Sequence, residues 1–182
     1  MKILRKKIIS SSKYLDFVST TYLNMNNDES EWFSVERKNN GKTVLVAATV
    51  DDKLVVTKEF RVAIGGYEWA LPAGLVEEGD SVEKTAKKEL KEETNLELIE
   101  IIEKTPYMAN SAGLTNEVVS IVFATAKGKT SRQGNEQSED IETFLLNRDK
   151  VKNLMQDKKK VFSAKAWLIF DRFVREGGWE KN

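Results

Sequence analysis

Acidic residues crowd one short segment of the chain, between Gly74 and Leu96, which reads GLVEEGDSVEKTAKKELKEETNL. A helix is predicted from Val82 to Thr94, with Ser81 as its N-cap, because a serine hydroxyl can accept a hydrogen bond from a free amide of the first turn. Asn95 fits just beyond the helix, since asparagine tolerates a left-handed backbone better than most residues. Carboxylates spaced along one helix could bind a metal ion or move protons.

The predicted helix turns its acidic side chains toward its apolar face. At about 100° per residue, one apolar stripe is formed by Val82, Ala86 and Leu90. Glu89 and Glu93 fall close to this stripe and Glu92 lies at its shoulder. The outward side carries the lysines, which are Lys84, Lys87, Lys88 and Lys91. A merely solvated helix face would not place its acids toward the core.

Carboxylates held near a core need a compensating charge. Like charges three or four positions apart destabilise a helix by roughly 0.2–0.5 kcal/mol per pair, and partial burial adds a larger desolvation cost. A divalent cation would offset both, since Mg²⁺ prefers oxygen ligands and bridges to phosphates. On composition alone, an ordinary charged helix with Glu–Lys pairs is the preferred interpretation. The fixed spacing of the acids is what favours a metal site.

The missing residue types narrow the chemistry further. The 182-residue chain has no cysteine and no histidine. This excludes disulfides, thiolate and imidazole metal sites, and catalysis by histidine or cysteine. A reaction must therefore rest on carboxylates, lysine, arginine, hydroxyl groups or a metal that binds oxygen.

Charge and hydropathy give no sign of a nucleic-acid or membrane partner. Acidic and basic residues balance at 29 each. No segment approaches the roughly 20 apolar residues of a membrane span, and the basic N-terminus lacks the apolar stretch of a signal peptide. We expect a cytoplasmic protein that binds neither nucleic acid nor a membrane.

The elements expected around the acidic helix are mainly strands. They are predicted at residues 32–37, 43–50, 54–57, 60–64, 67–71, 117–126 and 141–146, with a second helix at 161–174. Asp51 and Asp52 form the turn of a hairpin, and Pro72-Ala73-Gly74 ends the strand before the acidic segment. The order of elements predicts a mixed α/β or α+β sandwich.

The segment from Gly74 to Leu96 resembles the signature of the Nudix hydrolase superfamily, Gly-x5-Glu-x7-Arg-Glu-(aliphatic)-x-Glu-Glu-x-Gly-(aliphatic). The matching residues are Gly74, Glu89, Leu90, Glu92, Glu93 and Leu96. The first Glu, the Arg and the final Gly are replaced by Asp80, Lys88 and Asn95. Lysine keeps the charge of arginine but loses its bidentate geometry.

This resemblance implies an α+β fold, the α/β/α Nudix sandwich, in which a mixed sheet lies between helices. The ligands that it implies for Mg²⁺ or Mn²⁺ are Glu89, Glu92, Glu93 and the carbonyl oxygen of Ala73. Lys88 would anchor the Nudix loop through Asp80 or Glu77.

The flanks of the box are similar to the ADP-ribose pyrophosphatase branch. Glu59-Phe60-Arg61 and Tyr67-Glu68-Trp69-Ala70-Leu71-Pro72-Ala73-Gly74 resemble its Q-Y-R and E-L-P-A-G motifs, with Ala70 in place of Glu. Residues 111–117 resemble S-P-G-x-S-x-E, with Ala112 in place of the proline. The segment 135–141 resembles an acidic loop that supplies the general base, here Glu139 or, as the alternative, Glu136.

The same branch implies where the substrate binds. Arg61 is expected at a phosphate, although it could equally be a surface cation. Trp32 is a candidate for stacking on adenine, with packing as the simpler interpretation. Gly113 and Leu114, in the segment after the box, complete the expected substrate-binding residues.

The implied reaction is metal-dependent hydrolysis of a nucleoside diphosphate linked to another group, with ADP-ribose giving AMP and ribose 5-phosphate. Another nucleoside diphosphate sugar, a dinucleotide or a damaged nucleotide stays open as the substrate, as does a non-catalytic nucleotide-binding module. Residues 1–40 are expected to form an N-terminal β extension that dimerises the protein, and residues 41–182 the Nudix domain.

Overall fold

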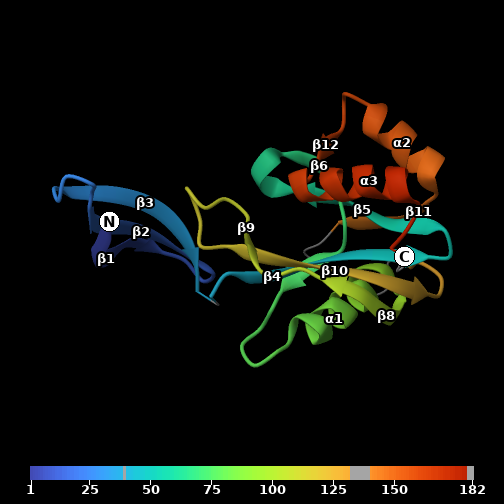
Figure 1. Cartoon of the computed structure of the whole chain (residues 1–182), viewed down its shortest axis with the longest axis horizontal. Coiled ribbons are helices and arrows are strands. Elements are labelled where there is room, and N and C mark those ends of the chain that lie inside the picture. Colours follow the sequence, from blue (N-terminus) through green and yellow to red (C-terminus); the bar gives the residue numbers. More distant parts are fainter. Residues whose placement is uncertain (39, 132–139, 180–182) are drawn as a thin grey trace.

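A computed structural model of the chain describes residues 1–38, 40–131 and 140–179 (Figure 1). Its three α-helices are α1 (Val82–Thr94), α2 (Arg148–Gln156) and α3 (Ala164–Glu176). The N-terminal strands are β1 (Lys2–Ser11), β2 (Leu15–Leu23) and β3 (Glu29–Arg37). The other strands are β4 (Lys42–Val50), β5 (Lys53–Arg61), β6 (Gly66–Ala70), β7 (Ala73–Leu75), β8 (Glu97–Lys104), β9 (Met108–Ala109), β10 (Val118–Lys127), β11 (Ile141–Leu146) and β12 (Val161–Phe162).

The acidic helix forms with the bounds that its caps predict. The Ser81 hydroxyl accepts a hydrogen bond from the Lys84 amide at 3.1 Å, at the start of α1. Asn95 has a φ of 63°, and its amide donates to the Lys91 carbonyl at the other end. Local signals at both ends therefore fix the helix that carries the box.

The main sheet has nine strands in the order β12-β6-β5-β4-β10-β8, with β11 beside β5, β7 beside β4 and β9 beside β10. β4 and β10 are its parallel centre, where Val44 lies opposite Ser120. Side chains of β4 alternate between two cores, so that Val44 packs on the face of α1 and Leu45 on the face of α2 and α3. The predicted α/β/α sandwich is thus confirmed (Figure 1).

The N-terminal strands form a separate antiparallel sheet in the order β1-β2-β3. This sheet projects from one end of the sandwich (Figure 1). The predicted boundary at residue 40 falls between β3 and β4. Its role in dimerisation stays a prediction.

Three predicted elements were wrong in their bounds. The strand predicted at 60–64 is the end of β5, followed by the 3₁₀ turn Val62–Ile64. Pro72 does end β6, but Ala73 to Leu75 form β7 against β4 instead of a loop. The helix predicted at 161–174 is strand β12 followed by α3, because Val161 and Phe162 pair with β6 before the helix begins.

Strands β1 and β2 lie within the β extension predicted for residues 1–40, whereas strands β8 and β9 and helix α2 were not predicted. β8 follows the box directly and is held by pairing with β10, which lies about twenty residues further along the chain. A sequence signal did exist for α2, since the side chain of Asn147 caps it by accepting from the Lys150 amide at 3.0 Å.

Within the described ranges, none of the helices has both the length and the apolar character needed to cross a membrane.

Candidate functional site

A cavity of about 680 Å³ opens where β4, β6 and β7 meet the starts of β10 and α3 and the middle of α1. The box carboxylates line it, together with the backbone that precedes them: Ala73, Gly74, Glu89, Glu92 and Glu93. Arg61 and Lys88 line the same cavity. Acids and bases that lie apart in the sequence thus face one space.

The carboxylates of α1 are held unequally. Glu93 is only 7% exposed, and its Oε1 accepts a hydrogen bond from the Ala73 amide at 3.4 Å. The Glu89 carboxylate lies against the backbone at Gly74. Glu92, predicted at the shoulder of the apolar stripe, lines the cavity with 49% of its side chain open to solvent. Glu93 is one of the residues of α1 that are buried against the core, and Glu92 is not.

Gly74 is required by the close approach of Glu89. A Cβ atom at this position would overlap the Glu89 carboxylate group. We expect Gly74→Ala to lower the free energy of unfolding by about 1–3 kcal/mol, the usual cost of overpacking, and to displace Glu89 from the cavity. Urea unfolding measures this loss.

The matched control for Gly74→Ala is Gly66→Ala, because the nearest atom to a Cβ there is the Ile64 carbonyl oxygen at 4.0 Å. We expect the control to unfold at nearly the wild-type urea concentration. Equal stability of the two variants would contradict the close approach at Gly74.

The donor set of the cavity suits a hard cation. It consists of carboxylate oxygens and the Ala73 carbonyl, the ligand types that Mg²⁺ and Mn²⁺ prefer. Across residues 1–38, 40–131 and 140–179, no three acidic side chains already lie together as a metal-binding group. Glu89, Glu92 and Glu93 would therefore need side-chain rotation to share an ion. The room that only a glycine leaves at position 74 lets the Glu89 carboxylate lie against the backbone there.

Lys88 binds the loop before α1 through one of its two predicted partners. Its Nζ lies 3.6 Å from Glu77 Oε1 and 4.0 Å from Glu92 Oε2. The charge of Glu92 is the largest cause that raises the pKa of Lys88 above its usual value; burial opposes it, and the charge of Glu77 adds to it. Asp80 pairs instead with Lys84 at 2.5 Å. Lys84 is about one helical turn from Asp80 and Lys88 is about two, so Asp80 pairs with the nearer lysine.

Arg61 lies at the cavity edge between two carboxylates. Its Nη1 is 2.5 Å from Glu59 Oε1, and its Nε is 3.1 Å from Glu68 Oε2. These ion pairs orient the guanidinium at the end of β5, and its contact with a phosphate stays a prediction.

Trp32, Gly113 and Leu114 do not line the cavity that holds the carboxylates. The Trp32 indole donates to the Gly113 carbonyl at 3.0 Å, and the Leu114 carbonyl accepts from the Val35 amide at 2.8 Å. These contacts join β3 to the loop before β10. Sequence order gave no sign of this pairing, which joins residues about 80 positions apart.

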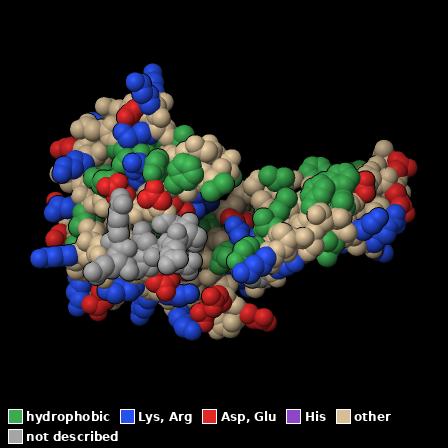
Figure 2. All heavy atoms as spheres, turned by 180° about the vertical axis from the view of Figure 1, so that it is seen from behind, with side chains coloured by type: hydrophobic (Ala, Val, Ile, Leu, Met, Phe, Trp, Pro, Cys, Tyr) green, Lys and Arg blue, Asp and Glu red, His purple; other side chains and the backbone are tan. Residues whose placement is uncertain are grey.

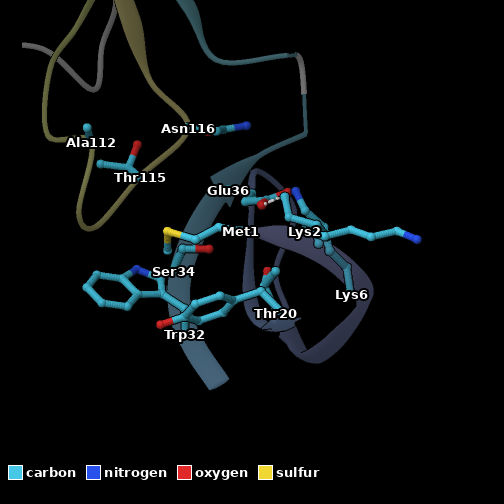
Figure 3. A pocket seen from close by; sticks show the side chains of 12 residues that line it. Met1, Lys2, Lys6, Thr20, Trp32, Ser34, Glu36, Ala112, Thr115 and Asn116 are labelled. Carbon is cyan, nitrogen blue, oxygen red and sulfur yellow. Dashed lines mark hydrogen bonds and ion pairs between the residues drawn. The ribbon is translucent and has the colours of Figure 1, made fainter. Parts of the chain in front are cut away.

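Trp32 lines a second cavity, of about 410 Å³. In Figure 3, Trp32 and Met1 lie on the side of the N-terminal sheet, while Ala112 and Thr115 come from the facing loop. Trp32 is 49% exposed there. An aromatic surface is thus open to a ligand, although it lies outside the carboxylate cavity.

Sequence reasoning missed a polar group at the end of the carboxylate cavity nearest the N-terminal sheet. Arg37 Nε lies 2.5 Å from Glu117 Oε2, and the Asn110 amide group donates to the other Glu117 oxygen. The Oδ1 atom of Asn110 is buried and has no hydrogen-bond partner in the described part of the protein. Glu117 closes the segment 111–117, so its position in that motif was an available signal.

The two candidates for the general base, Glu136 and Glu139, lie outside the described residues. Their assignment stays a prediction from the sequence.

Several known proteins are similar to this chain in sequence or in structure. A family model described as "NUDIX domain" matches residues 39–167. The chain is 30% identical over 135 residues to the ADP-sugar pyrophosphatase of Mus musculus, which is 69% of this chain and 62% of that protein. It is 30% identical over 126 residues to the ADP-ribose pyrophosphatase of Saccharomyces cerevisiae (strain ATCC 204508 / S288c), which is 64% of this chain and 54% of that protein. The chain therefore spans less than two thirds of the length of either relative.

One solved structure extends the similarity to the N-terminal sheet. The crystal structure of an ADP compounds hydrolase superposes with a TM-score of 0.74 at 19% identity, and covers 98% of this chain and 96% of the other. At this identity the likeness shows a shared fold alone. Because the family match covers more than half of the chain and includes the box, the chain belongs to the NUDIX domain family.

Proposed function

We propose that the protein hydrolyses the diphosphate of a nucleoside diphosphate linked to a second group, with ADP-ribose giving AMP and ribose 5-phosphate. The observation that carries this proposal is the cavity in which the box carboxylates meet Arg61 and Lys88. Carboxylates suit a divalent ion, and guanidinium groups suit phosphate oxygens. The names of the mouse and yeast relatives support the choice of an ADP-linked substrate.

In the proposed reaction, water attacks one phosphorus atom of the diphosphate and the bridging oxygen leaves with the other phosphate. Glu89, Glu93 and the Ala73 carbonyl would hold the divalent ion, with Glu92 joining them from the exposed side. Such an ion, when bound, neutralises the diphosphate charge and lowers the pKa of bound water. Glu139, or Glu136 in its place, would accept the proton of the attacking water. Arg61 would bind a non-bridging phosphate oxygen.

Another nucleoside diphosphate sugar is the second candidate substrate. Ala70 lines the cavity at a position where the resembled branch carries a glutamate. The smaller side chain removes one acceptor and leaves room for a different sugar.

The test is a product assay on ADP-ribose, ADP-glucose, a dinucleotide and an oxidised nucleoside triphosphate, each with Mg²⁺, with Mn²⁺ and with chelator. We expect AMP and ribose 5-phosphate from ADP-ribose as the fastest reaction, and no turnover with chelator. Tight binding of ADP-ribose without any metal-dependent product would instead support a non-catalytic module.

We also propose that the N-terminal sheet forms a homodimer. Figure 2 shows hydrophobic side chains gathered on this projecting sheet, and its exposed residues include Ile3, Ile8, Phe17, Trp32 and Phe33. Apolar surface of this kind marks an interaction site. Sedimentation equilibrium of the whole chain tests the dimer, and a monomer at micromolar concentration would contradict it. The cytoplasmic location stays a proposal from the sequence.

A further inference from the structure

The wall of the carboxylate cavity opposite α1 carries polar side chains that the proposed reaction does not use. Ser163 and Lys165 line the cavity from the start of α3, and Glu68 lines it from β6. Helices α1 and α3 lie on opposite faces of the main sheet (Figure 1). The box carboxylates and Lys165 therefore reach the cavity from opposite sides.

The start of α3 is fixed to the strand that leads into the box. Val161 and Phe162 of β12 pair in parallel with Glu68 and Trp69 of β6. The Ser163 amide donates to the Trp69 carbonyl at 3.0 Å. The Ser163 hydroxyl makes no capping hydrogen bond with α3. Ser163 and Lys165 thus line the cavity where the backbone is tied to β6.

Lys165 differs from the other basic residues of this cavity. Arg37, Arg61 and Lys88 each form an ion pair with a carboxylate. Lys165 is partly buried and forms no ion pair with any residue in the described part of the chain. An ammonium group that loses water without gaining a partner carries a desolvation cost. A ligand with oxygen atoms at this wall would remove that cost.

The two ends of the cavity differ in chemistry. Tyr14 is the one aromatic among the described lining residues, and it lies near Arg37 at the N-terminal sheet. A nucleoside base stacks on aromatic surface, so the base fits that end. The part of the lining that comes from β6 and the start of α3 offers a donor in Lys165, an acceptor in Glu68, and both in Ser163. Sugar hydroxyl groups donate and accept, and match this set.

Resting on the proposed function, we infer that Lys165 and Ser163 form a subsite for the sugar on the non-nucleoside side of the diphosphate, with Lys165 as a specificity-determining residue. The ammonium group donates to a sugar oxygen from the face opposite the box carboxylates. The substrate class follows: nucleoside diphosphates whose second group carries free hydroxyls, in preference to those that end in a plain phosphate.

The test measures binding without turnover, by titration calorimetry of the whole chain. The two ligands are ADP-ribose and ADP in which a methylene group replaces the bridging oxygen of the diphosphate. We expect Lys165→Gln to weaken the binding of the ADP-ribose analogue by about 10-fold or more, the loss typical of removing a charged hydrogen-bond donor. The dissociation constant of the ADP analogue should change by less than about 3-fold. The Lys165→Arg variant should bind both analogues nearly as the wild type does.

The matched control is Lys158→Gln, since Lys158 is an exposed lysine before β12 that does not line the cavity. We expect it to bind both analogues like the wild type. If Lys165→Gln weakens the binding of both analogues equally, Lys165 contacts the diphosphate and its assignment to a sugar subsite is wrong.

The same titrations separate this inference from the proposed function. If the wild type hydrolyses ADP-ribose and Lys165→Gln binds both analogues normally, the inference fails and the function stands. If the wild type binds the analogue but hydrolyses nothing, a selective loss in Lys165→Gln supports the inference while the function fails. A wild type that binds neither analogue and hydrolyses none of the substrates overturns both.

Discussion

Glu93→Gln is expected to lower kcat for ADP-ribose with Mg²⁺ by at least about 10³-fold, a loss at the upper end for removing one group that stabilises transition-state charge. The substitution removes a charge and keeps the volume of a side chain that is 7% exposed. The new amide oxygen can still accept from the Ala73 amide, as Oε1 of Glu93 does at 3.4 Å. The fold should therefore survive while the metal loses a ligand.

Steady-state kinetics across a Mg²⁺ titration check this result, and thermal unfolding followed by circular dichroism checks the fold. Glu100→Gln is the matched control, because Glu100 is exposed on β8 and does not line the cavity. An unchanged kcat in Glu93→Gln would refute the assignment of Glu93 as a metal ligand.

Glu139→Gln is expected to lower kcat by about 10²–10⁴-fold, the contribution typical of a general base. The affinity for ADP-ribose should stay near that of the wild type, because the neutral amide keeps the shape of the side chain and removes only its capacity to take a proton. Rapid-quench kinetics give kcat, and equilibrium binding of a non-hydrolysable analogue gives the affinity.

Glu136→Gln is the paired variant for this second prediction. It lies three residues earlier in the same segment, and we expect it to keep most of the wild-type kcat. The opposite result, a large loss in Glu136→Gln and a small one in Glu139→Gln, would move the base to Glu136. Two unaffected variants would place the base elsewhere in the chain.

The part of the site that sequence could predict is the part that one helix carries. Periodicity placed Glu89 and Glu93 on the inner side of α1, and the structure puts both at the cavity. Periodicity placed Glu92 at the shoulder of the apolar stripe, and Glu92 lines the same cavity with about half of its side chain open to solvent. The choice of Glu77 over Asp80 as the partner of Lys88 depended on the path of the loop before α1.

The sequence by itself determined the family, the helix of the box with both its caps, and the strand β4, whose apolar run is buried on both faces. These follow from short-range rules, because caps and periodicity act between residues a few positions apart. Tertiary structure alone decided that Arg37 meets Glu117, that Trp32 meets Gly113, and that Lys165 lines one cavity with the box carboxylates. Each of these contacts joins distant segments through sheet pairing and core packing, whose register depends on the whole chain at once.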